Sequence, residues 1–315
     1  MSGPAGFEYP PQEVSWNRRD VLLFASSIGC SADEIHFLYE LDPNFQTFPT
    51  YPVVLALTKH GFAGQKGTSS DTTDFTANSK KIPIPGAPPL DSNRVLDGSR
   101  RMTFLKPLPT TSEGRKFEAR TKVVGVYDKG KAGTVVETEQ SIVDAVTGEV
   151  YTKANGNAFY VGQGNWGGPK GPATVNYPPP KDRAPDAVCE FGASHEIALL
   201  YRLNGDYNPL HADAVLGAKR GFGGIINHGL YSWNCSAHGI LKTLGGNDPK
   251  NLKEFQARFA APVKPGYKLS VLMWKTGKTE QGCEEVIFVV KNQEGLVVLS
   301  NGRALVKIVG PKSKI

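Results

Sequence analysis

The segment GDYNPLH, residues 205–211, places a carboxylate, an amide and an imidazole within seven residues. A histidine has an ordinary pKa of about 6.5, so His211 is suited to proton transfer beside the Asp206 carboxylate. Gly205 favours the left-handed conformation that ends a helix, and Pro209 keeps Asn208 extended. This bend predicts that the three polar side chains converge and hold one water molecule for acid–base chemistry.

An Asx-turn with a capping aspartate and a surface histidine is the structural alternative for such a loop. A comparison of the two halves of the chain argues against it, because DVLLFASSIGCS from Asp20 and EIALLYRLNGDY from Glu196 match at an offset of 176 residues. At this offset Cys30 stands for Asp206 and Ile35 stands for His211. The repeated scaffold therefore does not need these polar groups in order to fold.

A long helix is predicted to follow Asn227, which is suited to the N-cap position. Apolar residues recur at spacings of three and four from Leu230 to Leu244, and two glycines end the pattern. Gly229 then lies in the first turn, where free N–H groups and the helix dipole favour negative charge on an oxygen atom.

Short β-rich segments separated by glycine turns occupy residues 116–161 and 268–309. Further repeats are TFLKPLP against RFAAPVKPG, from Thr103 and Arg258, and ANGNAFYV against SNGRALVKI. We therefore predict an α+β double hot-dog fold, in which two tandem repeats each have a long central helix wrapped by an antiparallel sheet. The Gly/Pro-rich residues 164–186 are predicted to link repeat 1–163 to repeat 187–315.

Composition excludes several classes of partner. Apolar residues make up 39% of the 315 residues, enough for a large core. The net charge is +6, but lysines and arginines are scattered, so we expect no nucleic acid. No apolar run approaches the roughly 20 residues of a membrane span, so we expect no membrane insertion. The four cysteines form no CxxC pair, and neither disulfides nor a metal site is expected.

Residues 201–230, YRLNGDYNPLHADAVLGAKRGFGGIINHGL, resemble the hydratase 2 motif of the (R)-specific 2-enoyl-CoA hydratases. This MaoC-like group includes the hydratase region of the peroxisomal type 2 multifunctional enzyme. YELDPNFQTFPTYPVV and FLKPLP resemble its degenerate N-terminal repeat. One departure is LDGSR at residues 96–100, where that repeat usually carries LHGEQ, and it affects contacts with the acyl chain or CoA.

The resemblance implies a hydro-lyase that adds water reversibly, on one face, to trans-2-enoyl-CoA to give (R)-3-hydroxyacyl-CoA. It implies Asp206 and His211 as the catalytic pair, Asn208 as the supporting amide and Gly229 as the backbone donor to the thioester oxygen. No metal or cofactor is expected besides the CoA thioester substrate. A hot-dog acyl-CoA thioesterase and a non-catalytic acyl-CoA-binding protein are the alternatives. Candidate substrate or CoA contacts are Tyr201, Arg202, Gly205, Arg220, Phe222, His228 and Arg258, although His228 also suits a packing role.

We expect acyl-CoA as the small-molecule partner and a homodimer as the assembly. The final residues, Ser-Lys-Ile, differ by one conservative change from the Ser-Lys-Leu peroxisomal address, so a peroxisomal location is expected. A polar tail and a cytoplasmic location are the alternative, since the first residues show no signal peptide. The PTYPVV segment interrupts the helix of the first repeat and predicts room for medium or long acyl chains.

Overall fold

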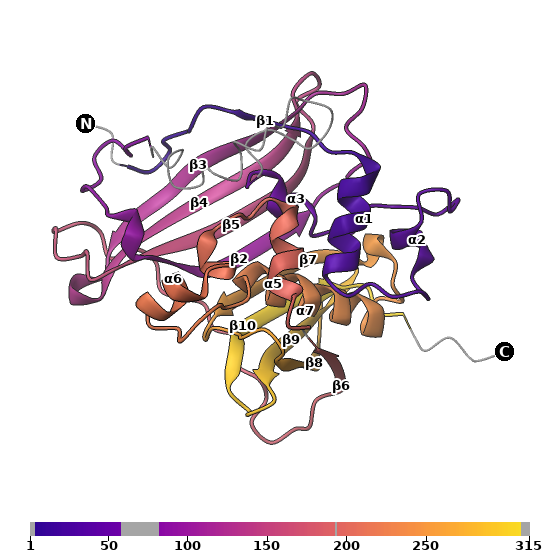
Figure 1. The fold of residues 1–315 in the computed structure, drawn as a ribbon. Coiled ribbons are helices and arrows are strands. Elements are labelled where there is room, and N and C mark those ends of the chain that lie inside the picture. Colours follow the sequence, from indigo (N-terminus) through magenta and orange to yellow (C-terminus); the bar gives the residue numbers. More distant parts are fainter. Residues whose placement is uncertain (1–3, 58–81, 193, 310–315) are drawn as a thin grey trace.

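Ten strands form one antiparallel sheet in this computed structural model, which describes residues 4–57, 82–192 and 194–309. The strands follow the spatial order β1-β3-β4-β5-β2-β7-β10-β9-β8-β6 (Figure 1). Their bounds are β1 Gln12–Val14, β2 Val95–Phe104, β3 Phe117–Asp128, β4 Gly133–Asp144, β5 Val150–Val161, β6 Ala187–Gly192, β7 Leu252–Phe259, β8 Lys268–Glu280, β9 Cys283–Asn292 and β10 Val297–Val306.

The helices are short apart from α1 and α7. The α-helices are α1 Arg18–Ser27, α2 Ile35–Leu38, α3 Pro52–Leu55, α5 Ile197–Tyr201, α6 Ala214–Lys219 and α7 Gly229–Leu244. Single 3-10 turns are η1 Ser92–Arg94, η2 Gly130–Ala132, η3 Arg202–Asn204, η4 Pro209–His211 and η5 Pro249–Asn251.

The strand order confirms the duplication. β2 and β7 pair antiparallel at the centre of the sheet, with Arg101 opposite Gln256, and each has four further strands on its outer side. Phe104 and Phe259 end these two central strands, as the match of TFLKPLP with RFAAPVKPG predicts. The two repeats therefore share one sheet, and the double hot-dog prediction is confirmed.

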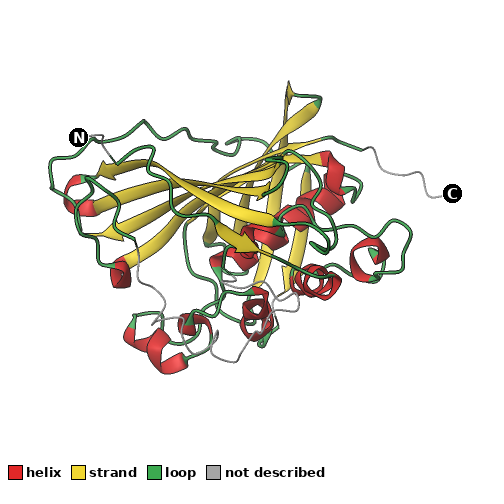
Figure 2. Ribbon diagram, turned by 90° about the horizontal axis from the view of Figure 1, so that it is seen from above, coloured by secondary structure: helices red, strands yellow, loops and turns green. Residues whose placement is uncertain are grey.

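The helix α7 packs on β6, β7, β8 and β10, on the face of the sheet that we call the concave face. Figure 2 shows most of the helices on one side of the strands. The helix α7 spans Gly229–Leu244, and the Trp233 ring packs on Phe255 with 4.6 Å between ring centroids. The predicted helix is confirmed, but its N-cap is His228 and not Asn227. Asn227 instead donates its backbone N–H to the Val263 carbonyl, so that residue belongs to the preceding loop.

The first repeat departs from the plan of a long central helix. At the offset of 176 residues, the first turn of α7 corresponds to the four-residue α3, and Ala56 follows as its C-cap. Pro52 is tolerated at the first helical position because the N–H that it lacks has no partner there. Within the described residues, only the second repeat therefore has the long helix expected of both.

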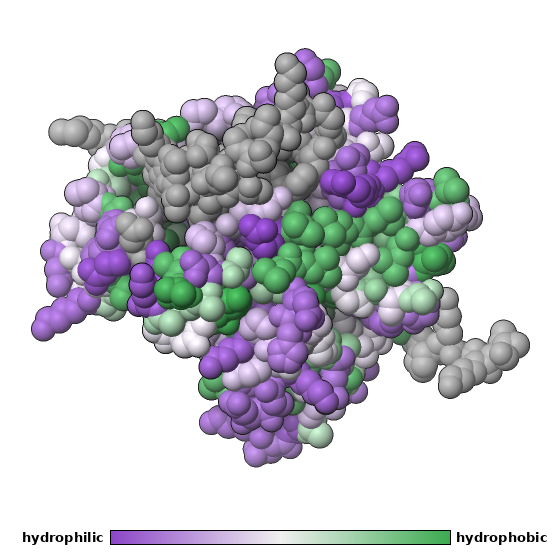
Figure 3. All heavy atoms as spheres, viewed as in Figure 1, coloured by the Kyte–Doolittle hydropathy of each residue, from purple (hydrophilic) through white to green (hydrophobic). Residues whose placement is uncertain are grey.

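The segment of residues 164–186 has no helix or strand. Its beginning lies on the first repeat, where the Asn165 and Gly167 N–H groups donate to the Asp128 carboxylate, and its later part runs along the second repeat. Tyr177 donates its N–H to the Asn301 side chain at 2.5 Å, and Arg183 donates to the Lys275 carbonyl at 2.8 Å. Figure 3 shows apolar side chains gathered in a band on the face that carries α1 and α5. In the described parts of the chain, every helix is too short or too polar to cross a bilayer.

Candidate active site

The loop after η3 adopts the predicted bend. Gly205 is left-handed, with φ of 109°, and Asn208 is extended, with φ of −53° and ψ of 119°. The Asn208 side chain accepts a hydrogen bond from the Leu210 N–H at 3.1 Å and so caps η4. The Asn208 N–H donates to the Asp206 carboxylate at 3.3 Å. Asn208 thus holds the loop and the carboxylate together.

The bend brings Asp206 and His211 together with His228, the residue before α7. Potential ligand atoms of these three side chains all lie within 4.8 Å of one another. His211 Nδ1 lies 2.8 Å from the Ile226 carbonyl, which can only accept, so Nδ1 carries the ring proton. His211 Nε2 is therefore left with a lone pair that can accept a proton.

His228 packs against His211 and binds the backbone of Asp206. Its ring stacks on the His211 ring, with centroids 3.7 Å apart and an interplanar angle of 29°. Its Nε2 donates to the Asp206 backbone carbonyl at 3.0 Å. Burial, followed by the proximity of His211, lowers the His228 pKa to about 3, so this ring is neutral. The structure gives His228 the packing role that its sequence also suits.

The electrostatics of the pair follow from burial. Burial raises the pKa of the Asp206 carboxyl, and His211, the Asn208 N–H and Arg202 oppose this rise. Burial lowers the pKa of His211, and the Asp206 charge and the bond to the Ile226 carbonyl oppose this fall. His211 is therefore a neutral base at neutral pH, and the carboxylate lies beside the proton that it would gain.

Gly229 opens α7 next to this pair. Gly229 is exposed although almost all of α7 is buried, and as the first residue of the helix it has an N–H without a partner within the helix. A Cβ at this position would lie 3.0 Å from the Phe259 ring. Glycine therefore leaves the close approach that an oxyanion needs, at the positive end of the helix dipole.

The other predicted contacts divide into two groups. Tyr201 and Arg202 lie close to the pair, because the Tyr201 ring is 5.1 Å from the His228 ring and the Arg202 guanidinium is 4.9 Å from the Tyr207 ring. Arg220 and Phe222 follow α6, and Arg220 is exposed.

The structure does not bring Arg258 to the pair. Alternate residues of a strand point to opposite faces. Phe255 packs on α7 and Phe259 lies against Gly229, so both face the concave side of the sheet. Arg258 is exposed on the convex side, opposite the candidate site.

Sequence reasoning missed the Ile226 carbonyl, the Phe259 ring and Asn234. Asn234 donates to the Tyr201 hydroxyl at 2.7 Å and so braces a ring that packs on His228. No local pattern marks these residues, because each contact joins segments that are distant in sequence.

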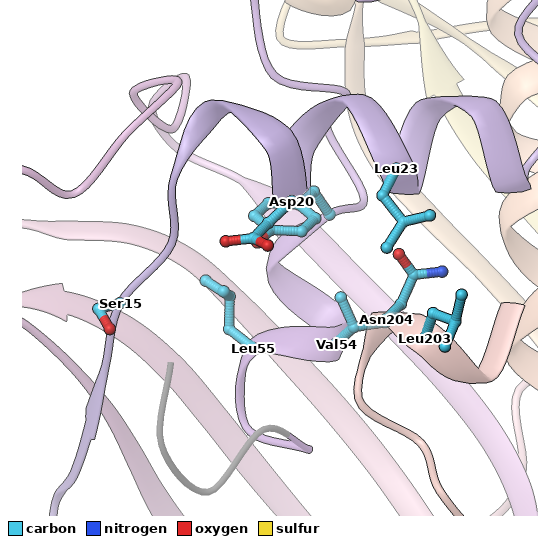
Figure 4. Close-up of a pocket in the computed structure, with 8 residues that line it drawn as sticks. Ser15, Asp20, Leu23, Val54, Leu55, Leu203 and Asn204 are labelled. Carbon is cyan, nitrogen blue, oxygen red and sulfur yellow. The ribbon is translucent and has the colours of Figure 1, made fainter. Parts of the chain in front are cut away.

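Two cavities lie away from the catalytic pair. One, of about 10 Å³, lies between α1, α3 and η3 and has room for about one water molecule (Figure 4). One oxygen of the buried Asp20 has no hydrogen-bond partner among the described residues. The other cavity, of about 370 Å³, lies at the far end of β2, where Lys106 pairs with Glu149 and Arg115 pairs with Asp144.

Two groups of side chains have the ligand spacing of a metal site. The first is Asp206, His211 and His228, where each ring already donates one N–H to a carbonyl. The second is Cys30, Glu34 and His238. Glu34 accepts a 2.8 Å hydrogen bond from the Lys242 ammonium, a charge that disfavours a cation there.

Comparison with known proteins gives the family. The description "MaoC like domain" matches residues 177–297, and "MFE-2 hydratase 2 N-terminal domain" matches residues 14–162. The chain is 48% identical over 314 residues to a probable dehydratase NIT22 of Ajellomyces capsulatus, covering 96% of this chain and 81% of that one. It is 33% identical over 304 residues to a probable enoyl-CoA hydratase 2 of Dictyostelium discoideum, covering 94% and 93%.

Solved structures agree with the sequence comparisons. The crystal structure of a MaoC-like dehydratase from Phytophthora capsici matches with a TM-score of 0.81 and 30% identity, over 98% of this chain and 97% of that one. By fold, repeat arrangement and motif, the chain belongs to the MaoC-like family, and its first half belongs to the hydratase 2 N-terminal domain family.

Proposed function

We propose that this protein catalyses the reversible, single-face hydration of trans-2-enoyl-CoA to (R)-3-hydroxyacyl-CoA. The observation that carries the proposal is the His211 tautomer, in which Nδ1 is bound to the Ile226 carbonyl and Nε2 is left as acceptor beside Asp206. Membership of the MaoC-like family and the names of the relatives support the same reaction.

The proposed reaction uses one water molecule held between Asp206 and His211. His211 Nε2 takes a proton from the water as its oxygen bonds to C3 of the enoyl group. The electron pair of the double bond moves to the thioester oxygen, where the Gly229 N–H stabilises the enolate. The proton then passes to C2 on the same face. All atoms of the water are in the product, and both residues regain their starting states.

Incubation with crotonyl-CoA and trans-2-decenoyl-CoA tests this function. We expect the absorbance of the conjugated thioester to fall, with a product of (R) configuration. Hydration of decenoyl-CoA would support the predicted room for longer chains, and strict restriction to four carbons would count against it. A thioesterase would instead release a CoA thiol that reacts with a thiol reagent, and a binding protein would change neither signal.

We also infer a homodimer and a peroxisomal location. Several relatives carry peroxisomal names, which supports the location. Residues 313–315 lie outside the described residues, so the Ser-Lys-Ile address stays a prediction. Imaging of a fluorescent fusion with and without these three residues tests the address, and light scattering of the purified protein tests the dimer.

A further inference from the structure

Arg100 is the last residue of the LDGSR segment and lies on the concave face of β2, two residues before the buried Met102. The offset that matches Phe104 with Phe259 places Phe255 at the equivalent position of the second repeat. Phe255 is fully buried, packs on Trp233 of α7 and stacks on Phe288 at 5.0 Å. The first repeat thus has a charged side chain where its partner repeat has an aromatic core.

The Arg100 guanidinium is only partly satisfied. Its Nη2 donates to the Asp97 carboxylate at 2.8 Å, the only hydrogen-bond partner of this guanidinium among the described residues. Nε is buried without a partner in that part of the chain. Nη1 lies over Gly156, where an added Cβ would be 2.4 Å away. The side chain keeps 25% of its surface exposed.

Polar residues of the neighbouring strands share this face with buried apolar ones, since Val123 lies opposite Thr138 and Ala154 lies opposite Gln140. Gly156 lies opposite Arg100 on β5, and Thr138 lies opposite Gly156 on β4. In the next row, the Gln140 amide donates to the Thr121 hydroxyl at 3.2 Å. Arg100, Thr121, Thr138 and Gln140 are all only partly buried, and they form what we call the polar stripe of the first repeat.

The polar stripe begins at β2, which pairs with β7 of the second repeat. Arg100 pairs across the strands with Ala257, and Phe259 lies two residues further along β7 against Gly229. Diagonal neighbours of this kind are about 7–8 Å apart. The Trp233 indole also donates to the Arg100 carbonyl at 3.3 Å, one helical turn beyond Gly229. The geometry therefore places Arg100 close to where an acyl chain with its thioester oxygen at Gly229 would begin.

We propose that Arg100 is a specificity-determining residue that selects enoyl-CoA substrates whose acyl chain carries a hydroxyl or carbonyl oxygen beyond the double bond. This inference rests on the proposed hydratase function. Asp97 balances the charge of the guanidinium, so a neutral oxygen acceptor fits the remaining donors better than a second carboxylate. A plain alkyl chain would leave these donors without a partner and remove them from water, which is unfavourable.

The test compares kcat/KM for trans-2-decenoyl-CoA with that for three analogues carrying one hydroxyl, at carbon 6, 8 or 10. We expect at least one hydroxylated chain to be preferred about tenfold, as for one added hydrogen bond to a charged group. Arg100→Met should bring this ratio to about one. Arg100→Gln, which places the usual glutamine of the LHGEQ segment here, should also lower it.

The matched control is Arg101→Met, because Arg101 is the next residue, points to the convex face and pairs with Glu254. This variant should keep the wild-type ratio. A wild type without preference for any hydroxylated chain, or an Arg100→Met ratio equal to that of wild type, would overturn the inference. If Arg100→Met does not fold, the test of the inference rests on the kcat/KM ratio of the wild type and on that of Arg100→Gln. If the protein hydrates crotonyl-CoA but shows no such preference, only this inference is wrong. If it hydrates none of the thioesters, the proposed function is wrong too.

Discussion

At the scale of single residues, two backbone carbonyls determine where the ring protons lie. The Ile226 carbonyl takes the Nδ1 proton of His211, and the Asp206 carbonyl takes the Nε2 proton of His228. Hydrogen bonding of one ring nitrogen leaves the other nitrogen of His211 as a base. The backbone thus prepares the imidazole before any substrate arrives.

Replacement of either catalytic side chain should lower turnover without unfolding the protein. We expect Asp206→Asn and His211→Gln each to lower kcat by at least about 10², the usual contribution of an acid or base. The double variant should be only slightly slower than the slower single variant, because both groups act on one water. Measuring kcat together with Tm checks this, since a merely turn-capping aspartate would lower Tm and leave turnover unchanged.

The pH dependence of kcat/KM follows from the same pair. Activity needs an ionised Asp206 and an unprotonated His211, so it is lost on acidification and retained at neutral pH. The Asp206 charge raises the His211 pKa, and its removal therefore lowers that pKa. We expect the acid limb of the profile of Asp206→Asn to lie at lower pH than that of wild type. A limb that stays in place or moves to higher pH would contradict the assignment of His211 as the base.

At the scale of elements, α7 joins the catalytic loop to the sheet. Its N-terminus presents Gly229, and the end of β7 presents Phe259 against it. The first repeat has no such arrangement in its described residues, since α3 has four residues. In the described part of the chain, the concave face of the first repeat carries Arg100 where the second repeat packs Phe255 against α7.

A methyl group at Gly229 should impair catalysis more than stability. In Gly229→Ala the Phe259 ring must shift by a few tenths of an ångström, and alanine favours helix by up to about 1 kcal/mol. We expect kcat/KM to fall more than about tenfold, because the methyl group obstructs the thioester oxygen, while Tm changes little. Gly229→Ala combined with Phe259→Leu should stay slow; recovery would show that the clash with the ring was the cause.

At the scale of the whole molecule, the two repeats share one sheet, and only the loop of the second repeat carries the Asp206 and His211 pair, since Cys30 and Ile35 stand at the matching positions of the first. In the loop of the first repeat, Glu34 accepts hydrogen bonds from His238 at 2.6 Å and Lys242 at 2.8 Å, which ties the loop to α7. The loop that carries the candidate catalytic residues in the second repeat thus corresponds to a loop that binds α7 in the first repeat.

Restoring the acid alone should not restore a second site. In Cys30→Asp the position that corresponds to His211 is still Ile35, which is 47% exposed and cannot accept a proton. Titration of active sites should therefore give about one site per chain, as in wild type. A titre near two would show that the first repeat keeps a hidden base.

Local chemistry in the sequence determined the bend at Gly205, the extended Asn208, the C-terminal end of α7 and most strands. Each depends on residues that are close along the chain, through backbone preferences and apolar periodicity. Asp206 and His211 could be named as candidate catalytic residues from the sequence because both lie in one short loop.

Tertiary structure alone decided which residues surround that pair. Arg258 and Arg100 are both arginines of central strands, but one faces the convex side and the other faces the concave side. A shift of one residue in strand register exchanges the two faces, and register depends on pairing between distant segments. The Ile226 carbonyl and the Phe259 ring approach the site through loop and strand packing of the same non-local kind.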